Sequence, residues 1–149
     1  MNDLAKTLED VFGFSSFRPG QEEIINHLMQ KKELLAVMPT GAGKSLCFQL
    51  PALLFENQTI VVSPLVALMD DQVIGLKDLG VNAERVHSGM AESKRNQVWE
   101  DFKNKTIKIL YISPESLMRN EMICALKPLN ISMFVVDEAH CISKWGSDF

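Results

Sequence analysis

Short apolar runs alternate with helical patterns along this chain. Strands that are apolar at every position are covered on both faces, which is typical of a parallel sheet between two layers of helices. We therefore predict an α/β fold with a mostly parallel sheet and helices on both faces. The runs that predict buried strands are 33–38, 59–63, 84–88, 107–112 and 132–137.

Between these runs the apolar residues recur with the period of a helix. Gly13 is placed to end a first helix, and Pro19 suits the first turn of a second one. A further helix is expected over 65–79, before Gly80, and Pro51 should kink or end the helix that contains it. The expected inward residues are Leu4, Leu8, Val11 and Phe12, then Ile24, Ile25, Leu28 and Met29, then Leu65, Leu68, Met69, Leu76 and Leu79.

Composition limits the classes of function. With 149 residues and 46% apolar content, the chain is about one domain long and has enough apolar residues for a core. The formal net charge of −4 excludes a basic surface all round, so any contact with nucleic acid must be local. Three cysteines without a CxxC pair favour reduced thiols in a cytoplasmic protein. No apolar run approaches the length of a membrane span, and the acidic N-terminus is unlike a signal peptide.

The stretch PTGAGKS follows the first predicted strand and opens a predicted helix. Glycines let successive backbone N–H groups point into one loop, and the helix N-terminus adds partial positive charge, so the pattern indicates a phosphate cradle. Lys44 would reach the β- and γ-phosphates of ATP, and the Ser45 hydroxyl would bind Mg²⁺. The alternative is a plain glycine turn, and Met38 replaces the first glycine of the usual pattern. The loop residues are Pro39, Thr40, Gly41, Ala42, Gly43, Lys44 and Ser45.

A pair of acids ends the last apolar run, in FVVDEAH. Ligands of parallel sheets collect at the carboxyl ends of the strands, so Asp137 and Glu138 should face the phosphate loop. Asp137 would hold Mg²⁺ and Glu138 would deprotonate an attacking water. A strand that ends in solvated acids is the alternative. Together with PTGAGKS, the pair favours ATP hydrolysis.

Motifs along most of the chain resemble the first motor domain of a RecQ-family DNA helicase, a superfamily 2 helicase of the DEAH-box type. The resemblance implies a RecA-like P-loop NTPase fold, ATP, Mg²⁺ and translocation 3′ to 5′ along single-stranded DNA. It extends from about residue 8 to the last residue, with matching order and spacing. The motifs are FRPGQ (17–21), MPTGAGKS (38–45), SPLVALMDDQ (63–72), ISPE (112–115) and DEAHCISKWGSDF (137–149).

The resemblance also implies an adenine pocket formed by Phe14, Arg18 and Gln21. The amide of Gln21 would pair with adenine N6 and N7, and Phe14 would pack on the base. Phe14 could equally belong to the core beside Phe12 and Phe17. A binding role for Gln21 is supported by the resemblance alone.

Contacts to DNA are implied at residues that follow the predicted strands, although each alone is also a common turn or cap residue. The aromatic loop after DEAH would stack on bases, but Lys144 and Ser147 stand where the family usually has Gln and His. His140 would link the nucleotide site to a second motor domain. Trp99 instead fits a helical core position. The implied DNA contacts are Ser63, Pro64, Gln72, Ser88, Ser113, Trp145 and Phe149.

Eleven residues follow Glu138, whereas the family continues into a second RecA-like domain. We therefore expect residues 1–149 to be a helicase ATP-binding domain that is incomplete at its C-terminus, with hydrolysis depending on the second domain. Single-stranded or partly duplex DNA is the expected partner. A nucleotide- or DNA-binding fragment without turnover is one alternative, and a DEAH-type RNA helicase is another.

Overall fold

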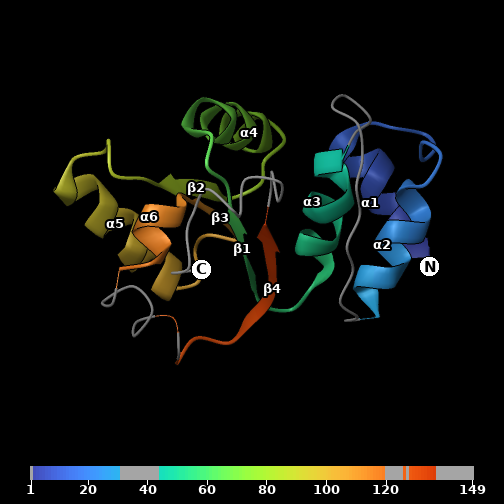
Figure 1. Ribbon diagram of the computed structural model, residues 1–149. Helices are drawn as coiled ribbons and strands as arrows, with labels where there is room; N and C mark the ends of the chain where they lie inside the picture. Colours follow the sequence, from blue (N-terminus) through green and yellow to red (C-terminus); the bar gives the residue numbers. More distant parts are fainter. Residues whose placement is uncertain (1, 31–43, 120–125, 127, 137–149) are drawn as a thin grey trace. The chain divides into compact units, whose positions relative to one another are not determined.

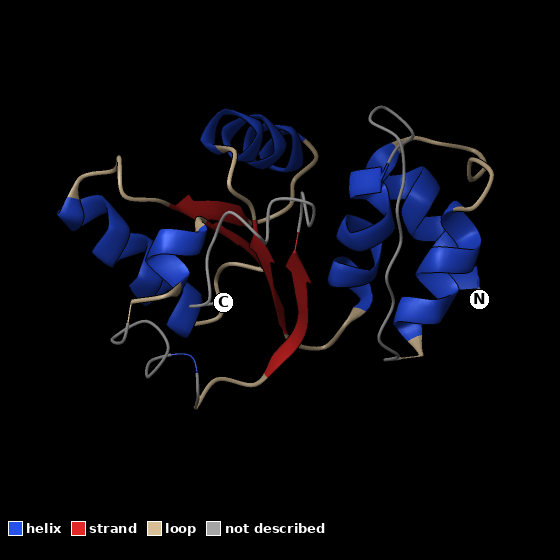
Figure 2. Cartoon of the chain, viewed as in Figure 1, coloured by secondary structure: helices blue, strands red, loops and turns tan. Residues whose placement is uncertain are grey.

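The computed structural model describes residues 2–30, 44–119, 126 and 128–136. The chain divides into two compact units, residues 1–55 and 56–149, which are taken one at a time below. Figure 1 labels the helices and strands, and Figure 2 separates them by colour. The predicted strand 33–38 lies outside the described residues. No helix in the described part of the chain is long and apolar enough to cross a membrane.

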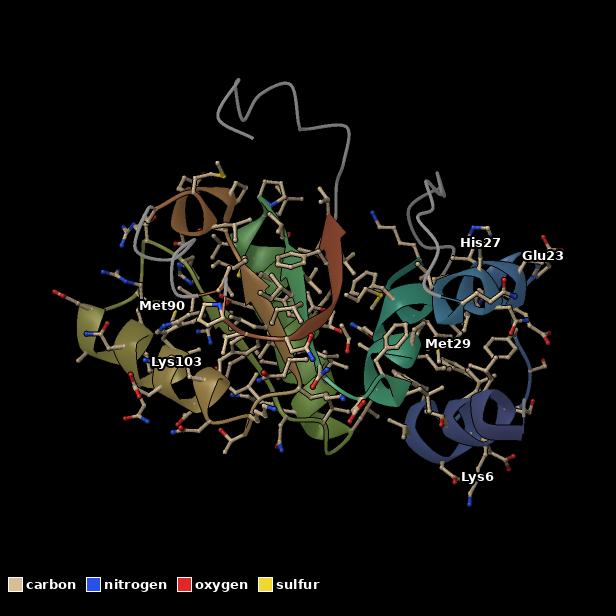
Figure 3. The ribbon with its side chains drawn as sticks, turned by 90° about the horizontal axis from the view of Figure 1, so that it is seen from below. Lys6, Glu23, His27, Met29, Met90 and Lys103 are labelled. Carbon is tan, nitrogen blue, oxygen red and sulfur yellow. The ribbon has the colours of Figure 1, made fainter. Side chains whose placement is uncertain are left out.

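The first unit contains helices α1 (Asn2–Phe12), α2 (Gln21–Met29) and α3 (Lys44–Leu54) in its described part. Their apolar faces meet in one core, as the sequence period predicts. Met29, on α2, is partly buried against that core (Figure 3). The buried residues of the core are Leu4, Leu8, Ile25, Leu46, Cys47 and Leu50.

Two glycines set the limits of the first two helices. Helix α1 ends at Phe12, and Gly13 follows with a φ of 76° and donates its N–H to the carbonyl of Glu9 at 3.1 Å. This confirms the predicted end of the helix. Helix α2 begins at Gln21, so placing Pro19 in its first turn was wrong. Gly20, with a φ of 86°, is left-handed, and a helix cannot continue through that conformation from Pro19.

Pro51 does not end its helix. Helix α3 passes through Pro51 to Leu54, and the N–H of Phe55 donates to the carbonyl of Pro51 at 3.0 Å. The early end was therefore wrong, and the alternative of a kink at Pro51 stays a prediction. A proline inside a helix costs about 3 kcal/mol. Leu50 and Ala52 on either side of it are fully buried, and packing of this kind offsets that cost.

The second unit contains a parallel sheet. Its described strands are β1 (Gln58–Val62), β2 (Ala83–Val86), β3 (Ile109–Ile112) and β4 (Ile131–Val136). They lie in the order β2-β3-β1-β4, and all neighbouring strands are parallel. Four predicted strands are thus confirmed, with ends that differ by at most two residues. Strand β1 is buried along its whole length, as expected for a strand with covered faces.

Helices cover both faces of this sheet, as predicted. Helix α4 (Val66–Asp78) lies on one face, and α5 (Glu92–Lys103) and α6 (Pro114–Leu117) lie on the other (Figure 1). Trp99 of α5 stacks on Phe102 with ring centroids 5.6 Å apart, which confirms its expected packing role. The buried core on this face comprises Ile60, Val62, Val86, Val98, Phe102, Ile107, Leu110 and Ile112.

The predicted apolar stripe of α4 is only partly buried. Met69 and Leu76 are buried and so is Val73, but Leu65 and Leu79 are 47% and 43% exposed. Including Leu65 and Leu79 in the buried stripe was wrong. Both residues flank the helix, as its N-cap and C-cap, so their side chains do not follow the helical face.

Gln58 ties the start of β1 to the segment between α5 and β3. Its buried amide nitrogen donates to the carbonyls of Phe102 and Ile107, at 2.7 Å in each case. Both carbonyls belong to buried residues, so the amide satisfies two acceptors that water does not reach easily.

We predict that Gln58→Ala lowers the free energy of unfolding by about 2–4 kcal/mol, because two buried carbonyls lose their donor. Urea denaturation followed by circular dichroism measures the loss. The matched control is Gln97→Ala, which removes an exposed amide whose nitrogen donates to Asp101 on the same helix. It should change the free energy by less than about 0.5 kcal/mol. Equal losses for both variants would contradict the assigned role.

Candidate functional site

The carboxyl ends of the parallel strands meet at one edge of the sheet. Ser63 follows β1 and donates its backbone N–H to Ile112 at 3.0 Å. Ser113 follows β3 and donates its N–H to Val86 at 3.1 Å. Strand β4 ends at Val136, so the described chain stops at the position before the first acid of DEAH.

The hydroxyls of Ser63 and Ser113 already have structural partners. Ser113 is the N-cap of α6: its Oγ accepts from the N–H of Ser116 at 3.4 Å and donates to the Oγ of Ser116 at 3.0 Å. The Oγ of Ser63 accepts from the N–H of Leu65 at 3.4 Å. Both serines are buried. The turn and capping roles are therefore present, and contact of these two residues with DNA stays a prediction.

Gln72, on α4, is hydrogen-bonded to a residue of the sheet. The hydroxyl of Tyr111, on β3, donates to Oε1 of Gln72, on α4, at 2.6 Å. Tyr111 is fully buried, whereas Gln72 is partly exposed. The amide of Gln72 thus has one end fixed inside the unit and one side near solvent.

Ser88 lies in an exposed loop that α5 holds in place. Nη1 of Arg95 donates to the carbonyl of Met90 at 2.5 Å and to that of Ser88 at 3.4 Å. The N–H of Gly89 donates to Nδ1 of His87 at 3.2 Å. A guanidinium that bonds two carbonyls of one loop limits the loop's conformations, so Ser88 is presented at the carboxyl edge on a restrained segment.

In the first unit, Lys44 and Ser45 are the first two residues of α3. Both are partly exposed. The first turn of α3 contains no acidic residue, so no carboxylate of that turn neutralises the partial positive charge of the helix N-terminus. The preceding residues of the predicted cradle, 39–43, lie outside the described residues.

The predicted adenine pocket has two described features. Phe14 is 50% exposed, so the alternative in which it belongs to the core is wrong, while Phe17 and Phe12 do pack on that core. Gln21 is buried, and its Oε1 accepts from the N–H of Arg18 at 2.8 Å. The bond fixes the Gln21 side chain against the chain segment that precedes α2.

Burial changes the acidity of Cys47, one turn into α3. It raises the pKa of the Cys47 thiol, with a smaller opposing effect from a backbone hydrogen bond. The thiol therefore stays protonated at neutral pH and acts as a small apolar side chain in the core of the first unit.

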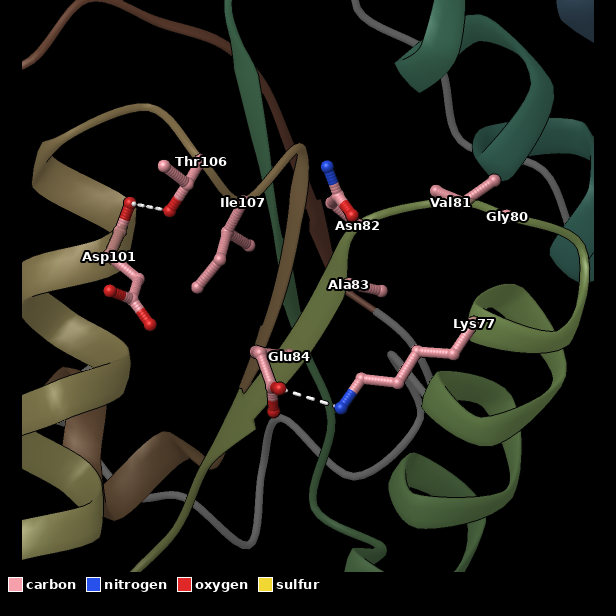
Figure 4. Close-up of a pocket in the computed structure, with 9 residues that line it drawn as sticks. All are labelled: Lys77, Gly80, Val81, Asn82, Ala83, Glu84, Asp101, Thr106 and Ile107. Atoms are coloured by element: carbon pink, nitrogen blue, oxygen red, sulfur yellow. Dashed lines mark hydrogen bonds and ion pairs between the residues drawn. The ribbon is translucent and has the colours of Figure 1, made fainter.

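A polar pocket lies at the opposite edge of the sheet, near the amino ends of β2 and β3 (Figure 4). Nζ of Lys77 and Oε1 of Glu84, 2.6 Å apart, form an ion pair in it. Nearby, the amine of Lys108 donates to the carbonyl of Asn57 at 3.0 Å, and burial lowers its pKa. Lys77 and Lys108 thus both have bonding partners within the second unit. The pocket is lined by Lys77, Gly80, Val81, Asn82, Ala83, Glu84, Asp101, Thr106 and Ile107.

Several predicted site residues lie outside the described residues: Pro39, Thr40, Gly41, Ala42, Gly43, Asp137, Glu138, His140, Trp145 and Phe149. Their roles, and the shared Mg²⁺ site of Ser45 and Asp137, stay predictions. The part of the chain that the structure describes holds no group of three or more His, Cys, Asp or Glu side chains suited to a metal ion.

Two residues that contact the predicted site were not predicted from the sequence. Tyr111 bonds Gln72, and Arg95 bonds the carbonyl of Ser88. Tyr111 did carry a signal, because it is the chain's single tyrosine and the only side chain with a hydroxyl in the run ILYI. Arg95 carried none, because basic residues on a helix are usually solvated.

Comparison with solved structures supports the fold. The chain is similar to the crystal structure of a hypothetical ATP-dependent RNA helicase from Sulfolobus tokodaii, with a TM-score of 0.77 and 21% identity. The match covers 98% of this chain and 44% of that one. The RecA-like α/β fold expected from the sequence is thus confirmed.

Comparison with curated proteins finds RecQ helicases. The chain is 45% identical to ATP-dependent DNA helicase RecQ of Pasteurella multocida over 95% of its own length and 22% of the relative. It is 45% identical to probable ATP-dependent DNA helicase RecS of Bacillus subtilis, covering all of this chain and 30% of that protein. It is 40% identical to ATP-dependent DNA helicase Q1 of Rattus norvegicus, covering 95% and 24%. The chain therefore spans less than a third of these relatives.

A protein-family model described as DEAD/DEAH box helicase matches residues 18–149. This range includes the predicted phosphate loop, the strands of the parallel sheet and the DEAH sequence. The family match and the similar proteins both indicate the helicase motor region that the sequence motifs indicate. The chain belongs to the DEAD/DEAH box helicase family, and within that family it is similar to the RecQ helicases.

Proposed function

We propose that this chain is the first motor region of an ATP-dependent DNA helicase that moves 3′ to 5′ along single-stranded DNA. The observation that carries the proposal is the position of Lys44 and Ser45 at the start of α3, directly after PTGAG in the sequence. Residues of this type at a helix N-terminus fit a nucleotide phosphate. A cytoplasmic location belongs to the same proposal.

Lys44 would bind the β- and γ-phosphates of ATP, and the N-terminus of α3 would add its partial positive charge. The lack of an acid in the first turn of α3 supports this role, because a carboxylate there would repel the phosphates. The hydroxyl of Ser45 and the carboxylate of Asp137 would hold Mg²⁺. When bound, Mg²⁺ neutralises charge on the transferred phosphoryl group.

Hydrolysis would depend on Glu138. In the sequence, Asp137 and Glu138 directly follow Val136, the last residue of β4. A carboxylate beside the γ-phosphate orients the attacking water and accepts its proton. Charge stabilisation by arginines would come from a second motor domain, which the resemblance implies. His140 would link the nucleotide site to that domain.

Adenine would be recognised by Gln21 and Phe14, with Arg18 beside them. The 50% exposure of Phe14 supports stacking on a base, because the ring has a free surface. Gln21 keeps its oxygen toward the N–H of Arg18, and a carbonyl oxygen with two lone pairs could also accept from adenine N6.

DNA would run along the carboxyl edge of the sheet. The exposure of Ser88 and the partial exposure of Gln72 and Pro64 support phosphate contacts there. Trp145 and Phe149 would stack on bases. The names of the relatives, which are DNA helicases, favour DNA over RNA as the substrate. Binding of nucleotide or DNA without turnover remains the second candidate for the chain by itself, because it spans less than a third of those relatives.

We predict that Lys44→Ala weakens MgATP binding about 10- to 100-fold, the effect of losing a charge-assisted hydrogen bond. Titration with a fluorescent ATP analogue measures it. Lys6→Ala, an exposed lysine on α1 of the same unit, is the matched control and should bind as the parent does. Unchanged affinity in Lys44→Ala would remove the phosphate role of this residue.

We predict that Gln21→Ala reduces the preference for ATP over GTP by about tenfold or more, because a bidentate amide contact is specific for adenine. Competition binding with the two nucleotides measures the ratio, which general weakening of the site does not change. Gln30→Ala, at the other end of α2, is the control. An unaltered ratio in Gln21→Ala would contradict the adenine-binding role of Gln21.

Residues 1–149 by themselves should bind MgATP but hydrolyse it about 10³–10⁵ times more slowly than a helicase with its second motor domain, because no arginine finger is supplied. A phosphate-release assay with and without single-stranded DNA tests this, with Lys44→Ala as the background. Robust DNA-stimulated hydrolysis would mean that a second copy of the chain supplies the missing arginine, or that the proposal is wrong.

A further inference from the structure

A hydrogen bond between Tyr111 and Gln72 joins the sheet to the predicted DNA-contacting helix. Tyr111 lies on β3, opposite Val61 of β1 in the register, and its side chain is fully buried. Its hydroxyl donates to Oε1 of Gln72 at 2.6 Å. A distance of this size is that of a well-formed O–H···O bond.

In this bond the oxygen of the Gln72 amide faces Tyr111. An amide is planar, and its oxygen and nitrogen lie on opposite branches of Cδ. When the oxygen is directed to Tyr111, the nitrogen with its two N–H donors is directed away from it. Gln72 is partly exposed, and its amide nitrogen has no bond to any of the described residues.

We propose that Tyr111 is a positioning residue that holds the Gln72 amide with its nitrogen outward, where it donates to a phosphate oxygen of single-stranded nucleic acid. The proposal rests on the proposed function. Phosphodiester oxygens only accept hydrogen bonds, so an outward NH₂ group fits them and an outward carbonyl does not. Tyr111 acts through Gln72 and does not itself touch the ligand.

A neutral amide predicts a particular salt dependence. Contacts from lysine or arginine release counterions, and each one steepens the fall of affinity with salt. A Gln72 contact releases none. Loss of the Tyr111–Gln72 pair should therefore lower affinity by the same factor at each salt concentration.

The test uses Tyr111→Phe, which removes only the hydroxyl, with Gln72→Ala and the double variant. The probe is a short oligothymidylate, titrated into isotope-labelled protein and followed by amide NMR spectra, a method suited to weak binding. Each single variant should bind about two- to tenfold more weakly than the parent, the effect of one hydrogen bond. The double variant should bind no more weakly than Gln72→Ala, because Tyr111 acts only through Gln72.

Gln97→Ala, on α5, is the matched control and should bind as the parent does, since its amide is held by Asp101. Equal binding by Tyr111→Phe and the parent would overturn the proposal while leaving the proposed function intact. A change in the slope of affinity against salt concentration in Gln72→Ala would also overturn the proposal. A double variant that is weaker than both singles would also overturn it, because Tyr111 would then act independently of Gln72.

A second readout does not depend on nucleic acid. The side-chain NH₂ signals of Gln72 in the free protein should shift and broaden in Tyr111→Phe, because the amide loses its anchor. Unchanged signals would overturn the positioning role. If the parent binds no oligothymidylate, the phosphate-donor role is overturned together with the DNA part of the proposed function, even where the signals respond.

Discussion

Strand β1 lies between β3 and β4 and is parallel to both, and this pairing constrains the rest of the second unit. Parallel neighbours cannot be joined by a short hairpin, so each connection must cross a face of the sheet. Helices α4 and α5 lie on these connections and cover opposite faces (Figure 1). The same constraint brings the carboxyl ends of all described strands to one edge.

The two edges of the sheet have different chemistry. At the amino edge, Gln58, Lys108 and Lys77 bond carbonyls or a carboxylate, and these polar groups hold connecting segments to the sheet. At the carboxyl edge, Ser63 and Ser113 use their backbone N–H groups to extend the pairing between strands. Ser88, which follows β2 at this edge, remains exposed.

Neutral hydrogen-bond donors and helix N-termini are suited to phosphate contacts in a chain whose formal net charge is −4. A negative chain gives no long-range attraction to phosphates, so specific contacts must come from local dipoles and single cations. In the proposed function, the start of α3 would be one such place, where Lys44 is combined with a first turn that lacks acids. In the proposed function, the amide of Gln72, which is bonded to Tyr111, would provide a second kind of contact that adds no charge.

The sequence by itself determined the α/β class and the alternation of elements, because the period of apolar residues reflects local geometry. It located β1, β3 and β4 within two residues, and it placed Lys44 at the start of a helix. Its errors arose where a single residue has several compatible roles. Pro51 continues a helix because its neighbours are buried, and Leu65 is exposed because it caps α4.

Only the tertiary structure decided which side chains meet across elements. Tyr111 and Gln72 are 39 positions apart, and Gln58 reaches Phe102 over 44 positions. No local pattern encodes such pairs, because they depend on the order of strands and on which face each helix covers. Likewise, the period of α1 could not place Phe14, which lies beyond the helix end at Phe12 and is exposed. The period of apolar residues in the sequence specifies the helices and strands. Contacts between residues that are far apart in the sequence depend on how the sheet and the helices pack.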